Sequence, residues 1–128
     1  MIDGKCPYYK IYHDSNIMAF LDKYPIDKGH SLVIPKKPYE KLTDMNNQEV
    51  AELFSKIPKI ANAIIKATNA DAFSIAQNNG RAARQIIPHV HVHIIPRYNS
   101  TGTLWLKRKI LKNNELDELA QKIRNCIE

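Results

Sequence analysis

The sequence has few cysteines and no long apolar segment. Its two cysteines, Cys6 and Cys126, stand near opposite ends of the 128 residues and form no C-x-x-C pair, which excludes a disulfide framework. No apolar run approaches the roughly 18 residues that span a membrane. The opening residues MIDGKCPYYK lack the apolar stretch of a secretory signal. We therefore expect a cytoplasmic protein without a membrane partner.

The composition is typical of one folded domain. Hydrophobic residues make up 44% of the chain and charged residues 25%, so the chain can bury a core and is not a disordered tail. Lysine and arginine number 19 against 13 aspartates and glutamates, a net charge of +6. This surplus suits an anionic partner, either a phosphate ligand or nucleic acid, and does not choose between them. We expect a single domain over residues 1–128.

Hydrophobic patterning predicts an alternation of strands and helices. The predicted strands are residues 8–12, 17–21, 30–34, 71–77 and 86–95. Apolar residues at helical spacing predict a long helix over 46–67, with Asn46 as its N-cap and Glu49 three residues on. Pro58 lies inside that pattern and should kink or split the helix.

A last helix is predicted near the C-terminus, capped by Asn113 or Asn114. Its apolar face is Leu116, Leu119, Ala120, Ile123 and Ile127. The order of strands, helix, strands and helix predicts an α+β fold with a mainly antiparallel sheet.

Three of the five histidines alternate with β-branched residues near the end of the sheet region. Because alternate side chains of a strand share a face, His89, His91 and His93 should face one way. Their neighbours Val90, Val92 and Ile94 should then face the core. A single histidine on a strand is usually explained by a solvent-exposed face. Three histidines at a regular spacing, backed by apolar residues, indicate a functional site instead.

Two chemical interpretations of these histidines are open from the residues alone. His91 and His93, with His30 from elsewhere, could hold a zinc ion. Alternatively, a neutral imidazole could attack phosphorus as a nucleophile near neutral pH. That reaction needs one ring nitrogen held as N–H, for example by a backbone carbonyl, so that the other presents its lone pair.

The segment from His89 to Ile95, HVHVHII, resembles the motif of the histidine-triad (HIT) family, in which three histidines alternate with apolar residues. Residues 19–22 (AFLD) and 29–36 (GHSLVIPK) resemble the family's N-terminal strands. Asn78-Asn79-Gly80, with Gln85 beyond, resembles its phosphate loop, and IIPR at 94–97 matches its bacterial and archaeal branches. The resemblance runs from about Cys6 into the last helix. It implies a HIT-like α+β fold with an antiparallel sheet, one long helix and a C-terminal helix.

The resemblance also implies an activity. HIT proteins are homodimers that attack the α-phosphorus of a nucleoside phosphoramidate, anhydride or related ester, form a nucleotidyl-histidine, and release the nucleotide with water. The chain is therefore expected to act on a purine, AMP-like nucleotide, without metal or cofactor. The alternative is a non-catalytic purine-nucleotide binding module or sensor. Action on adenylylated nucleic-acid ends ranks low, because no zinc finger or similar appendage accompanies the motif.

Carried over residue by residue, the resemblance makes His91 the nucleophile. The main-chain carbonyl of His89 would hold the Nδ1 proton of His91. His93 would hydrogen-bond the phosphate or the bridging atom, and His30 would support the same site from a neighbouring strand.

The resemblance names nucleotide-binding residues as well. Asp22 would accept both ribose hydroxyls, because a carboxylate offers two acceptor oxygens, and Phe20 would line the base pocket. Asn78 and Gln85 would contact ribose or phosphate. Taken alone, Asp22 could be an ordinary charge at a strand end, and Asn78 could be part of a simple turn.

The sequence departs from the family's pattern at a structural zinc site. Many prokaryotic members hold zinc with an N-terminal C-x-x-C and two histidines. Here Cys6 is followed three residues later by Tyr9, and Pro38 stands in place of a zinc histidine. Two of four ligands are missing, so we expect no zinc.

Two further departures lie beside the phosphate loop. Ile86 stands where several members have a polar side chain, so only its backbone N–H could donate to a substrate. Arg84 occupies a position that is often glycine, and its guanidinium could bind further phosphates of a substrate. The hypothesis is a preference for polyphosphate leaving groups over simple amines. Trp105 is expected to pack the C-terminal segment or the dimer interface, and the basic run 107–109 is read as solvated.

Overall fold

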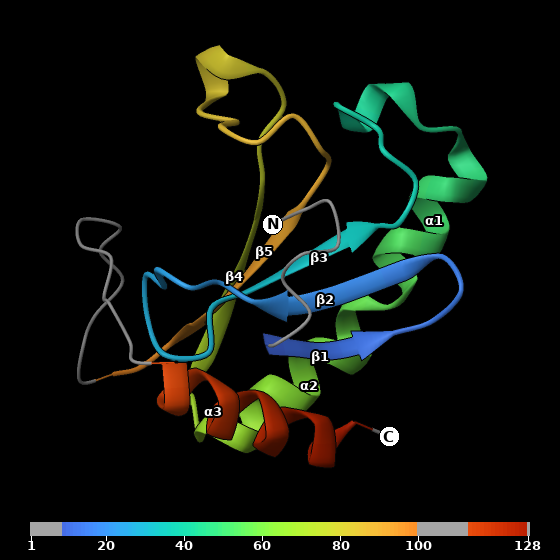
Figure 1. The fold of residues 1–128 in the computed structure, drawn as a ribbon. Coiled ribbons are helices and arrows are strands. Elements are labelled where there is room, and N and C mark those ends of the chain that lie inside the picture. Colours follow the sequence, from blue (N-terminus) through green and yellow to red (C-terminus); the bar gives the residue numbers. More distant parts are fainter. Residues whose placement is uncertain (1–8, 100–112, 128) are drawn as a thin grey trace.

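A five-stranded antiparallel sheet carries the fold (Figure 1). The computed structural model describes residues 9–99 and 113–127, so the predictions for Cys6, Trp105 and the run 107–109 lie outside the described residues. The strands are β1 (Lys10–His13), β2 (Ile17–Leu21), β3 (Ser31–Pro35), β4 (Ala72–Gln77) and β5 (Val92–Arg97), in the spatial order β1-β2-β3-β5-β4. Every neighbouring pair is antiparallel, which confirms the α+β prediction.

Three helices pack on one face of the sheet (Figure 1). They are α1 (Asn47–Ser55), α2 (Ile57–Thr68) and α3 (Asn113–Cys126). Two short 3₁₀ turns, η2 (Leu42–Asp44) and η3 (Arg81–Ala83), lie in the long connections. Within the described ranges, no helix combines the length and apolar character needed to cross a membrane.

The long predicted helix is split at its proline. Pro58 lies in the first turn of α2, where its missing N–H needs no partner. The N-cap prediction for α1 is also confirmed. The Asn46 side chain accepts a hydrogen bond from the N–H of Glu49 (2.8 Å), and the Glu49 carboxylate accepts one from the N–H of Asn46 (3.0 Å). These two bonds satisfy donors that would otherwise be unpaired at the helix start.

The main core lies between the sheet and the helices. Strand residues that point to the helices are buried, among them Ile17, Ala19, Leu21, Val33, Val92 and Ile94. The predicted apolar face of α3 joins them through Leu116, Leu119, Ala120 and Ile123. A smaller apolar cluster of Phe20, Leu32 and Ile34 occupies the opposite face of the sheet.

The predicted strand at 86–95 is wrong in its boundaries. Strand β5 begins at Val92, where its pairing with both neighbours starts: Val92 pairs with Gln77, the last residue of β4, and with Val33 of β3. His89 and His91 therefore precede the strand, and only His93 lies within it. Pro96, expected to close the strand, lies inside β5. Its missing N–H is tolerated because β3 pairs with β5 only as far as Ile94.

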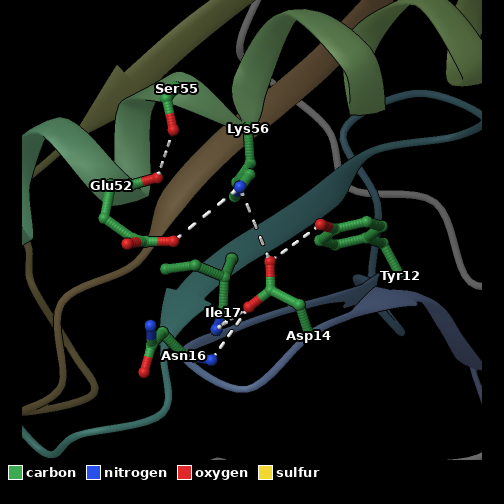
Figure 2. Close-up of polar contacts among 7 residues, drawn as sticks. All are labelled: Tyr12, Asp14, Asn16, Ile17, Glu52, Ser55 and Lys56. Carbon is green, nitrogen blue, oxygen red and sulfur yellow. Dashed lines mark hydrogen bonds and ion pairs between the residues drawn. The ribbon is translucent and has the colours of Figure 1, made fainter.

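The turn between β1 and β2 is fastened to the helices by one carboxylate (Figure 2). Asp14 Oδ1 accepts the N–H groups of Asn16 (2.8 Å) and Ile17 (2.9 Å), which closes the turn. Asp14 Oδ2 accepts the hydroxyl of Tyr12 (2.8 Å) and lies 3.9 Å from Lys56 Nζ, at the junction of α1 and α2.

This contact changes the ionisation of two groups. Burial acts to raise the pKa of Asp14, but hydrogen bonds from Asn16, Tyr12 and Ile17 and the charge of Lys56 outweigh it, so the net pKa is lowered. The hydrogen bond to Asp14 is the main cause that raises the pKa of Tyr12 to about 12. At neutral pH the pair is therefore a neutral phenol bound to an ionised carboxylate.

Gly29 makes the close approach between α2, β5 and the turn before His30. Its φ is +93°, and a Cβ there would lie 2.9 Å from Thr68 Cγ2 and 3.0 Å from Pro96 Cγ. Both the backbone conformation and the packing therefore require glycine at this position.

We predict that Gly29→Ala destabilises the fold by about 2–4 kcal/mol, the sum of left-handed strain and overpacking. Gly80→Ala is the matched control, because φ is +91° there but Lys41 Cε, at 3.8 Å, is the nearest contact. The control should lose less, about 1–3 kcal/mol, because only its backbone conformation and not its packing opposes a side chain. Urea unfolding of both variants measures the difference, and equal losses would contradict the packing argument.

Candidate active site

Strand register brings two of the predicted site residues to one face of the sheet. Phe20 of β2 pairs with Leu32 of β3, and Leu32 pairs with His93 of β5. Cross-strand partners point to the same face, so these three side chains form a row on the face away from the helices. Phe20 is buried and His93 is half-buried. The predicted base-pocket residue and the last triad histidine therefore share one surface.

The ring of His91 has a defined proton position. Its Nδ1 lies 2.7 Å from the main-chain oxygen of His89. A carbonyl oxygen only accepts, so Nδ1 carries the proton and, in the neutral ring, Nε2 keeps its lone pair. The ring is 7% exposed, and its centroid is 5.0 Å from that of His93. This is the geometry expected of a nucleophile at this position.

His30 and His93 carry their protons on Nε2, the nitrogen that is unprotonated in His91. The N–H of Ile26 donates to His30 Nδ1 (3.0 Å), so the proton of the neutral His30 ring is on Nε2. His30 Nε2 lies 2.8 Å from His93 Nδ1 and donates to it. The proton of His93 is then on Nε2. Nε2 of His93 therefore carries a proton, whereas Nε2 of His91 carries a lone pair.

His89 acts through its backbone and not through a free ring. Its Nε2 lies 2.8 Å from the main-chain oxygen of Pro35 and donates to it. The ring is 7% exposed and fastens the start of the histidine segment to the end of β3. The carbonyl of His89 thus orients the ring of His91, and the predicted part of His89 in catalysis stays a prediction.

Asp22 lies directly beyond β2 and beside His30. Its N–H donates to the His30 carbonyl (2.9 Å), and its Oδ1 accepts the N–H of Tyr24 (2.9 Å). Its Oδ2 is 3.7 Å from His30 Nε2, and its side chain is 13% exposed. The structure thus places the predicted ribose ligand next to the histidine cluster.

The predicted phosphate loop is held by Gln85. Its Oε1 accepts the N–H of Gly80 (2.6 Å), and its Nε2 donates to the main-chain oxygen of Glu40. A second bond runs from the N–H of Leu42 to Asn79 Oδ1 (2.8 Å). Gln85 is 5% exposed, and both ends of its amide are used. Gln85 therefore shapes the loop through both ends of its amide, and its predicted contact with ribose or phosphate stays a prediction.

The other predicted loop residues are more accessible. Asn78 is half-buried and follows Gln77, the residue that pairs with Val92, so it lies beside the start of the histidine strand. Arg84 is exposed and has a φ of +67°. Ile86 is 90% exposed. Sequence reasoning missed Ile26, Pro35 and Glu40, because they act through backbone groups that no side-chain pattern marks.

A metal site at the histidines is disfavoured by these hydrogen bonds. Asp22, His30 and His93 could each offer one atom, and the three atoms lie within 4.8 Å of one another. However, Ile26 donates to His30 Nδ1, so His30 Nε2 carries a proton and has no lone pair for a cation. Of the two interpretations left open by the sequence, this favours the nucleophile.

Two residues of this chain, Tyr9 and Pro38, stand where many prokaryotic family members have zinc ligands. Tyr9, in place of the second cysteine, is 6% exposed and belongs to the main core. Pro38 has no ligand atom in its side chain. The expectation that no zinc binds here stays a prediction.

A separate pocket of about 360 Å³ lies between the β1–β2 turn, the segment after β3 and the start of α1. It contains none of the predicted site residues. Its Glu49 accepts a hydrogen bond from Tyr39 and forms an ion pair with Lys37 (3.6 Å). The pocket is thus distinct from the histidine cluster.

The comparisons with known proteins agree with this geometry. The family model for the HIT domain matches residues 4–100. The chain is 41% identical to adenylylsulfatase HINT3 of Arabidopsis thaliana, over 99% of this chain and 64% of the plant protein, so it spans less than two thirds of that relative. It is 36% identical to adenosine 5'-monophosphoramidase hnt1 of Schizosaccharomyces pombe, over 77% of this chain and 71% of the yeast protein.

The fold is likewise similar to solved structures. A hypothetical histidine triad nucleotide-binding protein from Sulfolobus tokodaii superposes with a TM-score of 0.84 at 36% identity, covering 93% of this chain and 83% of that one. Sequence and structure therefore give the same family.

We predict opposite tautomers for two rings of this cluster. In long-range ¹H–¹⁵N NMR spectra at mildly alkaline pH, His91 should be protonated at Nδ1, and His30 at Nε2. The physical reason is that a carbonyl accepts from the first ring and a backbone N–H donates to the second. The same tautomer in both rings would contradict the proton order described above. Signals are assigned by single replacement of each histidine.

Proposed function

The chain belongs to the HIT domain family, and from that premise we propose that it is a nucleotide hydrolase that cleaves purine nucleotides at the α-phosphate through His91. The observation that carries the proposal is the proton order of the rings. His91 keeps a lone pair on Nε2, and the adjacent His93 keeps a proton on Nε2. A nucleophile and a proton donor on one face suit displacement at phosphorus.

In the proposed first step, His91 Nε2 forms a bond to the α-phosphorus. The bond from phosphorus to the leaving atom breaks, and its electron pair departs with that atom. Where the leaving atom is basic, as in an amine, the Nε2 proton of His93 passes to it. The carbonyl of His89 stabilises the positive charge that develops on the His91 ring, because it accepts the hydrogen bond from the Nδ1–H group of that ring.

In the second step, water attacks the phosphorus of the nucleotidyl-histidine. The phosphorus–nitrogen bond breaks, and its electron pair returns to His91 Nε2. Where His93 gave its proton to a basic leaving group, a proton of the attacking water restores it; where sulfate or phosphate left, that proton is released to solvent. The net reaction consumes one water and releases a nucleoside monophosphate and the leaving group. The neutral rings are regenerated, so each cycle is balanced.

The surrounding residues support a nucleotide as the substrate. Phe20 lies in register with His93 and would offer its ring to the base, as the family resemblance implies. Asp22, beside His30, would accept the ribose hydroxyls. Asn78 would approach the phosphate, with Gln85 holding the loop in place. Two relatives with the names adenylylsulfatase and adenosine monophosphoramidase support an adenine nucleotide.

We predict that His91→Ala lowers turnover of adenosine phosphosulfate and adenosine phosphoramidate by at least about a thousandfold, because it removes the nucleophile. His13→Ala is the matched control, since this histidine is exposed on β1 outside the site. Mass spectrometry of the wild-type chain after brief incubation should detect one adenylyl group on His91. Activity retained in His91→Ala refutes the assignment. Nucleotide binding by the wild-type chain without turnover supports the binding module instead.

We also propose that the chain forms a homodimer through β4. Within the described part of the chain, β4 pairs on one side only, with β5, and it presents Phe73 and Ile75 at 43% and 46% exposure. An exposed apolar edge strand is a template for pairing with another chain. Two copies joined at this edge would satisfy the free backbone groups and cover both side chains.

We predict that Ile75→Lys shifts the chain from dimer to monomer in sedimentation velocity, because it places a charge in the proposed interface. Ala51→Lys adds the same charge to the exposed face of α1 and should leave the dimer intact. A monomeric wild-type chain, or a dimer that tolerates Ile75→Lys, would refute this interface.

A further inference from the structure

Arg84 adopts a backbone conformation that costs free energy. Its φ is +67° and its ψ is 30°, the left-handed region that glycine occupies without strain. Its side chain is exposed and contributes nothing to the core. Strain of this kind persists where the residue serves a purpose other than stability. The position therefore points to a use for the guanidinium.

Two other basic residues, Arg81 and Lys41, lie on or beside the loop that carries Arg84. Arg81 begins the 3₁₀ turn that ends at Arg84, and its side chain is exposed. Lys41 comes from the distant segment after β3, and its Cε lies 3.8 Å from where a Cβ on Gly80 would stand. The bonds from Gln85 to Glu40 and from Leu42 to Asn79 hold the two segments together.

The loop brings these charges to the histidine segment. It starts after Gln77, which pairs with Val92, and it runs directly into His89. No aspartate or glutamate occurs from Asn78 to Val90. This loop therefore carries the positive charges of Arg81 and Arg84 and no negative side chain where the chain approaches the proposed nucleophile.

We propose that Lys41, Arg81 and Arg84 form a cationic rim that receives the leaving group and selects an anionic one, such as sulfate or phosphate, over an amine. This inference rests on the proposed hydrolysis at the α-phosphate. When the bond from phosphorus to the leaving oxygen breaks, the electron pair stays with sulfate or phosphate. The rim stabilises that added negative charge. An amine departs as a neutral molecule after taking a proton, so the rim does little for it.

The test compares two adenine nucleotides that differ only in the leaving group, adenosine phosphosulfate and adenosine phosphoramidate. Arg84→Gly should lower kcat/KM for the phosphosulfate by about ten- to a hundredfold, the range for a lost charge-assisted hydrogen bond. For the phosphoramidate the change should be less than about twofold. The melting temperature should not fall, because glycine relieves the left-handed strain. Lys41→Gln and Arg81→Gln should act in the same direction.

Lys122→Gln is the charge-matched control, because this lysine is exposed on α3, which packs against α2 and β1. It should leave the ratio of the two kcat/KM values unchanged. Raising the salt concentration should lower the phosphosulfate rate more steeply than the phosphoramidate rate, since exposed charges are screened. Equal losses on both substrates in Arg84→Gly, or no loss on either, overturn the inference alone. A wild-type chain that hydrolyses neither substrate overturns the proposed function and this inference with it.

Discussion

The hydrogen bond from His91 Nδ1 to the carbonyl of His89 is the interaction on which the site depends. A neutral imidazole has one proton and two nitrogens, so the group that binds one nitrogen decides the chemistry of the other. The neighbouring pair is ordered in the reverse sense by the N–H of Ile26. Two rings of the same kind, with centroids 5.0 Å apart, therefore present a lone pair and a proton. Backbone groups create this difference, directly at His91 and through the ring of His30 at His93.

The fold supports that arrangement by fixing the backbone at both ends. The ring of His89 and the carbonyl of Pro35 tie the histidine segment to β3, and the N–H of Val90 donates to the Tyr39 carbonyl (2.7 Å). At the other end, Gly29 lets the chain turn tightly between Asp22 and His30, against α2 and β5. The site is thus built on strand ends and turns, where backbone N–H and C=O groups are not consumed by the sheet.

Much of the architecture was predictable because local chemistry determines it. The apolar strand at 17–21, the capping box at Asn46 and the break at Pro58 each follow from short-range rules, and each is confirmed. The start of β5 was not predictable, because alternation over 86–95 is satisfied equally by an extended segment without strand partners. The pairing with β4, which ends at Gln77, and with β3, which stops at Val33, decides it. For the same reason, the partners of Gln85 and His30 are invisible in the sequence. They are backbone atoms of Glu40 and Ile26, brought near by topology.

The loop that carries Arg84 and the histidine rings have separate roles in the proposed reaction. In the proposed reaction, His91 is the same nucleophile for every leaving group, and the proton of His93 assists only a basic one, so neither ring favours sulfate over an amine. Discrimination must come from groups that respond to charge on the departing atoms. A left-handed arginine costs stability, whereas a glycine there would not, and its strain is local to an exposed turn. Because Gln85 and Asn79 anchor that turn independently of Arg84, its side chain can change without disturbing His91. Selectivity on this scaffold can therefore evolve at the loop while the chemistry of the histidines stays constant.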